Sequence, residues 1–410
     1  MSELITGIDI GSSSVKLAVG ERDKDNFINI ICTVEISSEG INKGIITSID
    51  DASFVFSRLL DQAEKIVGES ISGAYIGING LHIISQNNHG IVSVSRSDGQ
   101  IREDDVDRVK SSAQAIASPQ NYIIMETIPQ RYIVDGQSVV KDPVGMNGSR
   151  LELDAHIIQA LKSQNNNIIT SVTKSNIEVY DYIFSPIATS EAILDKKQKD
   201  LGVCLVNIGQ SLTTMAVYEN DTLLDTSVLS IGSRHITGDL AICLTESVDI
   251  AEMIKLKYGI GKGSKAIDKD EMIDLSQFDP EIEQKVSKRN VVRIMEARVE
   301  EVFRMVNKEL IKINKDSKLP VGLVLTGGGA KLNGISEVAK RVCKLPVTIG
   351  SVNNVNSVID KIYDPIYSTA IGLILYGDKK QQDEFGPSGF SNRGLSNAFS
   401  SFKSFFGKFF

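Results

Sequence analysis

A glycine- and serine-rich turn that occurs twice is the feature of this sequence with the clearest capacity for chemistry. Residues 7–20 read GIDIGSSSVKLAVG and residues 206–217 read VNIGQSLTTMAV, and when residue 8 is aligned with residue 206, five of twelve positions are identical. A strand–turn–strand of this kind presents backbone N–H groups at its tip, and a concave row of such donors binds anions. Two copies on facing parts of the molecule could therefore hold a polyphosphate from both sides.

Charged residues and glycines near these turns fit the same ligand. Lys16 follows the first turn and could reach phosphate oxygens. Asp9 precedes it and could hold a magnesium ion through water, since magnesium prefers carboxylate and water oxygens. Gly327, Gly328 and Gly329 follow an apolar run, and glycine alone lets the main chain press against a ligand. A single glycine turn is usually structural, so the prediction of a phosphate site rests on the order of all three motifs.

The elements that must position these turns form a repeated pattern. Short apolar runs and helical periodicity predict three strands, a helix and a strand in the first copy, at 4–10, 14–20, 27–36, 50–67 and 73–79. The second copy is predicted to hold three strands and two helices, at 202–208, 212–219, 222–231, 234–245 and 248–257. A buried strand at 321–329 and helices at 333–343 and 365–376 follow. A duplicated β-β-β-α unit indicates an α/β protein with two similar, facing lobes.

Length, charge and cysteine content exclude several classes of protein. The 410 residues suggest roughly two to four domains, and the net charge of −8 argues against a broad nucleic-acid-binding surface, so we expect no nucleic-acid partner. The four cysteines and four histidines are scattered, which favours reduced thiols over disulfides and argues against a metal centre built from them. The N-terminus has no signal-peptide pattern, and no run of about eighteen apolar residues occurs, so the expected location is the cytoplasm.

The C-terminal residues carry a separate signal. Seven of the fourteen phenylalanines lie in residues 390–410, after a polar stretch at 377–394 that is predicted to be a flexible linker. On a helical wheel of about 100° per residue, one arc of roughly 140° gathers the apolar residues, with Lys403 at its flank. The members of this face are Leu395, Phe399, Phe402, Phe405, Phe406, Phe409 and Phe410. The face could be covered by the protein's own core or by a membrane interface with anionic lipid, and the long linker favours the membrane.

The order of two phosphate turns followed by a triglycine turn resembles the actin, Hsp70 and sugar kinase superfamily. Within it, the sequence is similar to the FtsA family, the bacterial cell-division homologues of actin. Four segments carry the resemblance, which covers nearly all of the chain: DPVGMNGSRLELDAHII (142–158), IGSRHITGDLAICLTESVDIAEMIKLKYG (231–259), LTGGGAKLNGI (325–335) and PIYSTAIGLILYG (365–377). The resemblance implies an actin-like, two-lobed α/β fold with a duplicated βββαβα core, a small domain inserted in the first lobe and a C-terminal amphipathic helix.

The resemblance also implies ATP with Mg²⁺ in the cleft between the lobes. The matching residues are Asp9, Gly11, Ser12, Ser13, Ser14 and Lys16 in the first loop, Asn207, Gly209, Gln210 and Ser211 in the second, Gly232, Glu252 and Lys255 near the nucleoside, and Gly327, Gly328 and Gly329 in the adenosine turn, with Asp9 toward the metal. The family's second loop is usually Asp-Ile-Gly-Gly-Gly-Thr-Thr-Asp, whereas here Asn207 and Thr214 replace the two carboxylates. We therefore expect nucleotide binding with slow or undetectable ATP hydrolysis, and we assign no catalytic residue.

Pattern and resemblance together divide the chain into six parts. The expected boundaries are 1–80 with 365–380 for the first core lobe, 81–162 for the inserted subdomain, 163–231 with 321–364 for the second core lobe, 232–320 for its small subdomain, 381–394 for the linker and 395–410 for the amphipathic helix. The run REDDVD (102–107) in the inserted part is interpreted as a capped, solvated helix start rather than a catalytic cluster.

The resemblance implies a protein that polymerises, binds the C-terminal tail of the tubulin-like FtsZ and tethers FtsZ filaments to the cytoplasmic face of the inner membrane at the division site. The FtsZ tail is expected near residues 232–320, where a charged helix at 287–312 offers Arg and Lys side chains. The inserted subdomain is expected to contact other division proteins or another subunit. Two alternatives remain open: an actin-like type IV pilus assembly protein, which would not need the Phe-rich tail, and a sugar kinase, for which no carboxylate base stands out.

Overall fold

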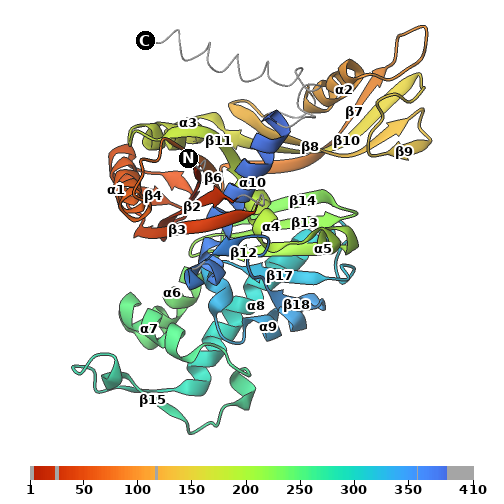
Figure 1. Ribbon diagram of the computed structural model, residues 1–410. Helices are drawn as coiled ribbons and strands as arrows, with labels where there is room; N and C mark the ends of the chain where they lie inside the picture. Colours follow the sequence, from red (N-terminus) through yellow and green to blue (C-terminus); the bar gives the residue numbers. More distant parts are fainter. Residues whose placement is uncertain (1–3, 24–26, 116–118, 358, 386–410) are drawn as a thin grey trace.

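The computed structural model describes residues 4–23, 27–115, 119–357 and 359–385. Two α/β lobes lie side by side, a smaller sheet domain projects from one end, and a helical part with the hairpin β15–β16 projects from the other (Figure 1). The predicted amphipathic helix at 395–410 lies outside the described residues. None of the helices described is long and apolar enough to cross a membrane.

The first lobe is built on a six-stranded sheet in the order β11-β6-β1-β2-β3-β19. Its strands are β1 (Leu4–Ile10), β2 (Ser14–Arg22), β3 (Ile28–Ser37), β6 (Gly73–Ile78), β11 (Glu178–Phe184) and β19 (Asn356–Ser357). β1, β2 and β3 form the predicted antiparallel meander, and β6 runs parallel to β1. Every residue of β6 is buried, as expected for a strand whose sheet is covered on both faces. A short hairpin, β4 (Ile41–Asn42) and β5 (Ile45–Ile46), follows β3.

Helix α1 (Ile49–Val67) packs on this sheet, and helix α3 (Lys162–Thr173) packs against α1. Ser48 accepts a hydrogen bond from the N–H of Asp51 in the first turn of α1. Gly68 ends the helix at φ 81°, in the left-handed region that favours glycine. Most of the apolar residues that predicted the helix lie on its buried side, whereas Ile66 in the last turn is 60% exposed.

The second lobe repeats the first around a five-stranded sheet in the order β14-β13-β12-β17-β18. Its strands are β12 (Val203–Ile208), β13 (Thr213–Glu219), β14 (Thr222–Leu229), β17 (Gly322–Thr326) and β18 (Val347–Ile349). β12, β13 and β14 form an antiparallel meander, and the parallel partner of β12 is β17, just as that of β1 is β6. The registers correspond as well, since Asp9 pairs with Lys16 and Asn207 with Thr214. The predicted duplication is confirmed.

Three helices of the second lobe extend it into a smaller subdomain: α6 (Ser233–Leu244), α7 (Val248–Tyr258) and α8 (Lys288–Lys312), with the hairpin β15 (Met272–Asp274) and β16 (Lys285–Ser287) at the tip. Helix α5 (Lys196–Leu201) packs on β13, and α9 (Ile335–Cys343) packs on α8 and β18. The predicted helices at 234–245, 248–257, 287–312 and 333–343 are confirmed within two residues at each end.

Two packed helices, α4 (Ser185–Ile193) and α10 (Ser368–Phe385), lie where the lobes meet. A Cβ atom on Gly372 of α10 would overlap the carbonyl group of Ala188 on α4, so glycine permits the close approach of these helices. α10 also packs on β1 and β2, and its first residues reach the region between the lobes.

The inserted domain follows β6 and holds a four-stranded sheet in the order β7-β10-β8-β9, with α2 packed on it. Its elements are β7 (Ile83–Ser93), α2 (Glu103–Ala115), β8 (Tyr122–Val134), β9 (Ser138–Val140) and β10 (Arg150–Leu161).

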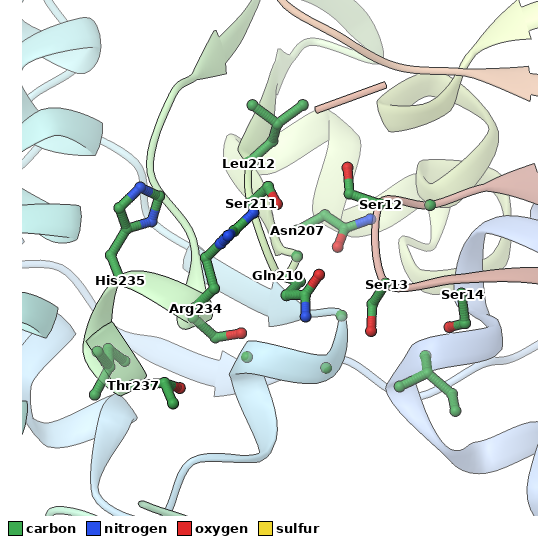
Figure 2. A pocket seen from close by; sticks show the side chains of 18 of the residues that line it. Ser12, Ser13, Ser14, Asn207, Gln210, Ser211, Leu212, Arg234, His235 and Thr237 are labelled. Atoms are coloured by element: carbon green, nitrogen blue, oxygen red, sulfur yellow. The ribbon is translucent and has the colours of Figure 1, made fainter. Parts of the chain in front are cut away.

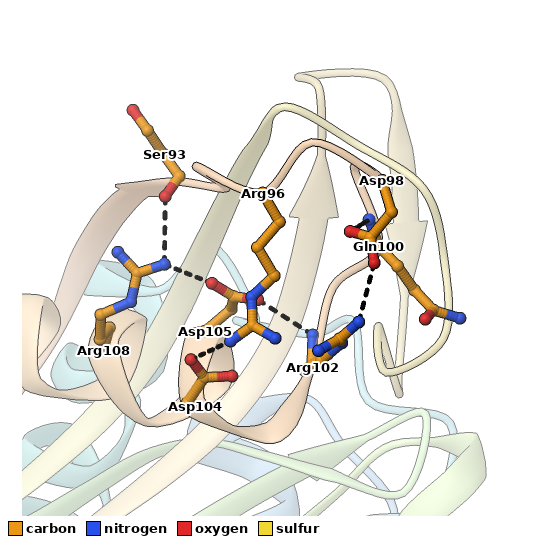
Figure 3. A network of polar contacts seen from close by, with 8 residues as sticks. All are labelled: Ser93, Arg96, Asp98, Gln100, Arg102, Asp104, Asp105 and Arg108. Carbon is orange, nitrogen blue, oxygen red and sulfur yellow. Dashed lines mark hydrogen bonds and ion pairs between the residues drawn. The ribbon is translucent and has the colours of Figure 1, made fainter.

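The run REDDVD begins helix α2, as predicted, but it is only partly solvated, because the side chain of Asp105 is buried. The backbone N–H of Arg102 donates to the carboxylate of Asp105 over 3.0 Å, and the same carboxylate pairs with Arg108 (Figure 3). A second pair joins Arg96 to Asp104. These acidic side chains complement the N-terminal end of α2, so they are accounted for by the helix itself.

The inserted domain docks on the second lobe through side chains that cover the outer edge of β14. The hydroxyl of Ser85 donates to the carbonyl oxygen of Thr226 over 2.7 Å. The amides of Asn87 and Gln130 donate to the carbonyl oxygen of Leu224 over 3.2 and 2.8 Å. Polar groups of the insert thus take the place of a neighbouring strand on this edge.

Three expected boundaries are wrong. We expected residues 163–231 in the second lobe, but β11 pairs with β6 of the first sheet, so the first lobe includes α3 and β11. We expected 321–364 there too, but β19 pairs with β3. The predicted linker at 377–394, or 381–394, starts too early, because α10 continues to Phe385, held by the donation from Arg22 Nε to Asp378 over 2.9 Å.

Candidate functional site

One cavity of about 1020 Å³ lies between the lobes, and it gathers nearly all of the residues singled out in the sequence. Fifteen predicted residues line it: Asp9, Gly11, Ser12, Ser13, Ser14, Lys16, Asn207, Gly209, Gln210, Ser211, Glu252, Lys255, Gly327, Gly328 and Gly329. Figure 2 shows the first loop and the second loop approaching this cavity from opposite sides. Gly232 is the exception: a Cβ atom there would lie 2.6 Å from the carbonyl oxygen of Gln210, so it packs behind the second loop.

The first loop directs its carbonyl groups away from the cavity. The carbonyl oxygen of Gly11 accepts from the hydroxyl of Ser38 over 2.6 Å, and that of Ser13 accepts from the N–H of Ser38 over 3.0 Å. In the part of the chain that the structure describes, the N–H groups of Ser12 and Ser13 have no hydrogen-bond acceptor. This loop therefore offers unpaired donors to the cavity, which is the geometry of an anion-binding nest.

The second loop uses the same arrangement with different partners. Its carbonyl oxygens at Gly209 and Gln210 accept from the N–H groups of Ser233 and Arg234, at the start of α6, over 2.9 and 2.8 Å. Among the described residues, no acceptor pairs with the N–H groups of Gln210 and Ser211. The two loops thus present matching sets of donors across the cavity.

The strand residues behind the loops differ in charge. Burial raises the pKa of the Asp9 carboxyl, and the nearby Lys16 ammonium opposes this increase. Lys16 is only 9% exposed and its Nζ donates to the carbonyl oxygen of Ser14 over 3.2 Å. On the other side, the amide of Asn207 donates to Thr369 Oγ1 on α10 over 3.3 Å. The floor of the cavity therefore has a carboxylate and an ammonium on one side and a neutral amide on the other.

Two buried hydroxyl groups in the cavity wall lack partners. Ser185 and Ser211 are each 1% exposed, both line the cavity, and neither hydroxyl has a hydrogen-bond partner among the described residues. Buried polar atoms without partners are uncommon because each costs on the order of 1–3 kcal/mol. Their position indicates a ligand or solvent that would supply the missing hydrogen bonds.

The triglycine turn after β17 contributes through close packing on the second loop. Gly327 has φ 81°, and a Cβ atom there would overlap the side-chain oxygen of Asn207. A Cβ on Gly329 would overlap the side chain of Ile208, whereas one on Gly328 would meet only Ile366, at 3.6 Å. Two of the three glycines are therefore needed to bring the backbone against the second loop.

The remaining wall comes from α6 and α7. Thr237 Oγ1 donates to Glu252 Oε2 over 2.5 Å, and Lys255 Nζ lies 2.7 Å from the same oxygen. The apolar side chains of Ile242, Val248, Leu256 and Leu332 also line the cavity. A wall that combines apolar surface with a few fixed polar groups is typical of a site for a small organic ligand.

Several residues that line the cavity are not among those predicted from the sequence. Glu35 accepts a hydrogen bond from Ser14 Oγ over 2.5 Å, and Ser185 precedes a proline at the start of α4. Thr237 and Arg234 lie inside the segment that carried the resemblance, so only their side-chain roles were missed. Glu35 and Ser185 have no local signal, because each reaches the cavity through sheet register and helix packing.

A magnesium ion fits this site in a limited way. Such ions keep several waters and bind one or two carboxylates together with phosphate oxygens. Asp9 contributes a carboxyl group on the floor, beside Lys16, and Asn207 contributes only an amide. No group of three or more His, Cys, Asp or Glu residues that could hold a metal occurs within the described ranges.

Comparison with known proteins assigns the family. A family model described as "Cell division protein FtsA" matches residues 204–372, and one described as "SHS2 domain inserted in FTSA" matches residues 80–159. The FtsA of Bacillus subtilis is 36% identical over 92% of this chain and 83% of its own length. The FtsA proteins of Pseudomonas aeruginosa and Escherichia coli are 33% and 31% identical, over 93% and 92% of this chain and 91% and 90% of their own lengths.

Solved structures confirm the actin-like fold. The type IV pilus biogenesis complex PilM–PilN aligns over 91% of this chain and 98% of the matched chain, with a TM-score of 0.67 and 14% identity. MreB5 of Spiroplasma citri bound to ADP aligns over 94% and 99%, with a TM-score of 0.55 and 10% identity. At such identities the likeness concerns the fold alone, whereas the sequence matches are specific. The chain belongs to the FtsA family of cell division proteins.

Proposed function

We propose that this protein is an ATP-binding, actin-like cell division protein that polymerises and tethers FtsZ filaments to the cytoplasmic membrane. The observation that carries the nucleotide part is the convergence of two loops with unpaired N–H donors, together with Lys16, on one cavity. Family membership supports the role in division. The MreB5 neighbour, whose structures hold ADP or AMPPNP, supports a nucleotide as the ligand.

In this proposal the two loops bind the phosphate chain and the walls from α6 and α7 bind the nucleoside. Lys16 lies beside the first loop and would neutralise phosphate charge. Asp9 would hold Mg²⁺ through water, and the ion would supply further charge neutralisation at the phosphates. Asn207 and Thr214 carry no charge, so the site lacks the two carboxylates of the family's usual second loop, which would position a metal for hydrolysis. We therefore propose binding with slow turnover.

Binding can be tested by titrating purified protein with ATP in a calorimeter. Wild type is expected to bind in the micromolar range, and K16A to bind at least tenfold more weakly because a buried cation beside the phosphates is lost. Exposed Lys308 on α8 does not line the cavity, so K308A is the matched control. If wild type takes up no ATP, the nucleotide part of the proposal is wrong.

The membrane part of the proposal rests on the C-terminal sequence, since residues 395–410 lie outside the described residues. Each fully buried Phe side chain contributes about 1.5–3 kcal/mol, so the six phenylalanines of this face could hold the chain on a bilayer. The test is flotation with anionic liposomes, comparing the full chain with a version ending at residue 394. Full-length protein should float and the truncated protein should stay at the bottom. Equal behaviour of the two would contradict the tether.

The partner surfaces are proposed from the family role. The FtsZ tail is placed on the small subdomain at 232–320, where the exposed Arg293 of α8 is one available cation. The inserted domain is proposed to bind another subunit or other division proteins. A pull-down of FtsZ with wild type and with an R293E variant tests the first surface. Loss of binding only in the variant supports it, and unchanged binding contradicts a role for this face of α8.

A further inference from the structure

The cationic side chains that line the cavity are not equally available to a ligand. They are Lys16, Lys43, Arg234, Lys255, Arg298 and Lys331. Three of them are already paired: Lys255 with Glu252 at 2.7 Å, Arg298 with Asp239 at 2.6 Å and Lys331 with Asp364 at 2.5 Å. Arg234 is the cation from the second lobe for which no carboxylate partner occurs among the residues described.

The backbone of Arg234 is fixed beside the second phosphate loop. Its N–H donates to the carbonyl oxygen of Gln210 over 2.8 Å, and the N–H of Ser233 donates to that of Gly209 over 2.9 Å. Figure 2 shows the Arg234 side chain extending from the start of α6 along this loop, in the direction of Ser211. Arg234 is an exposed residue, so its guanidinium can turn toward a ligand in the cavity.

An independent observation points to an anion-binding position at the same loop. The hydroxyl of Ser211 is buried, faces the cavity and has no partner, and the N–H groups of Gln210 and Ser211 have no acceptor among the described residues. Three donors without acceptors, next to an unpaired guanidinium, match the three acceptor oxygens and the negative charge of a phosphate group.

The carboxylates of the cavity are mostly engaged. Glu35 accepts from Ser14 Oγ over 2.5 Å, Asp239 pairs with Arg298, and Glu252 pairs with Lys255. Asp9 remains as a water-mediated ligand for a divalent cation, and Lys16 faces it. On the second-lobe side, the strand behind the loop carries Asn207 at the position that Asp9 holds in the first lobe, so this position contributes no charge.

We infer that Arg234 binds the phosphate chain of the nucleotide directly and that it makes binding of a nucleoside triphosphate largely independent of Mg²⁺. This inference rests on the proposed nucleotide function. Arg234 supplies the positive charge that a metal ion held by a second carboxylate would otherwise bring to this side of the phosphates. A guanidinium is suited to this role because its planar donors bind two phosphate oxygens at once. Lys16 neutralises the other side.

The test measures dissociation constants for ATP, ADP and adenosine, each in excess Mg²⁺ and in excess EDTA, for wild type and three variants. Wild type should bind ATP with less than a threefold difference between the two conditions. R234A should bind ATP about tenfold more weakly in EDTA, as expected when a charge-assisted hydrogen bond is lost. It should regain most of that affinity when Mg²⁺ is present, and its affinity for adenosine should stay within about twofold of wild type.

Two variants control for structural effects. R234K keeps the charge and should recover most of the ATP affinity, with less in EDTA because the bidentate contact is lost. R58A removes an exposed arginine of α1 that does not line the cavity and should behave as wild type. The inference is overturned if R234A binds ATP in EDTA as tightly as wild type, or if it loses adenosine as strongly as ATP. Absence of ATP binding by wild type in both conditions would instead overturn the proposed nucleotide function.

Discussion

In the first lobe, Asp9 and Lys16 face each other across β1 and β2, and in the second lobe the same register joins Asn207 to Thr214. Both loops tie their carbonyl oxygens to neighbouring groups and leave N–H donors toward the cavity. The backbone device is thus the same in the two lobes, whereas the formal charge beside it differs. The comparison teaches that the turn and its neighbours specify which backbone N–H groups face the cavity, and that the strand residues behind the turn set the electrostatics independently.

The largest expected effect is on the free energy of unfolding, and it comes from a carboxyl group that each lobe buries away from the cavity. In the inserted domain of the first lobe, burial and the nearby Asp181 raise the pKa of Glu126 to about 7, against the influence of Lys380. Such a group contributes stability below its unfolded pKa of about 4.5, and this contribution is lost as the pH rises through 7. E126Q should therefore be more stable than wild type by up to about 3 kcal/mol near pH 8 and almost unchanged near pH 4.

Asp225 on β14 provides the matched variant in the second lobe. Burial raises its pKa to about 6, while the N–H of Thr226 opposes the increase. D225N should gain its stability at a lower pH than E126Q and reach a plateau above about pH 6. Urea unfolding of both variants across this pH range measures the difference. A gain in stability that does not depend on pH would contradict the assignment of these two carboxyl groups.

The second effect compares the glycines that start the loops. A Cβ atom on Gly11 would lie 2.5 Å from the carbonyl oxygen of Ser14, whereas one on Gly209 would lie 3.0 Å from that of Leu212. G11A should therefore cost about 2 kcal/mol in stability and weaken ATP binding strongly, while G209A should cost less than about 1 kcal/mol. Thermal unfolding and calorimetric titration of the pair measure both. Equal losses would show that the loops tolerate side chains alike and would break this part of the comparison.

The smallest expected effect is on the Mg²⁺ dependence of ATP binding. It tests whether the charge at residue 207 accounts for the difference between the two lobes. N207D places a carboxylate opposite Asp9, so it should make ATP binding depend on Mg²⁺ by about tenfold, close to 1.4 kcal/mol. N207S removes the amide without adding charge and serves as the control. ATP titrations in excess Mg²⁺ and in EDTA give the ratio for each variant. If N207D and N207S show the same ratio, the identity of residue 207 does not set the metal requirement.

Much of the fold and most of the site follow from local sequence. Strand ends in Gly and Ser and the repeated apolar pattern are local signals, and they placed the meanders and the three loops correctly. Gly232 was assigned to the ligand because it lies in a matching segment, but its lack of a side chain serves the contact with Gln210. The sequence motif does not distinguish these two uses of a glycine.

The missed features depend on partners far away in the chain. β11 joins the first sheet by pairing with β6, which lies about 100 residues earlier in the chain. No local sequence pattern indicates a contact over such a separation. The polar end of α10 was predicted as a linker, yet Asp378 is bound by Arg22 and Lys380 by Asp181. A polar composition predicts a flexible segment, but these tertiary ion pairs hold the end of α10 as a helix. The linker prediction was wrong at 377–385 because the partners lie far away in the chain.

The covered edge of β14 has a consequence for dissecting this protein. A strand at the rim of a sheet with free carbonyl and N–H groups is a template for pairing with other chains, and natural proteins protect such rims. Here Ser85, Asn87 and Gln130 of the insert provide the protection. Deleting the insert would therefore expose the edge of β14. The shortened chain is expected to aggregate through this edge unless charged residues are introduced along it.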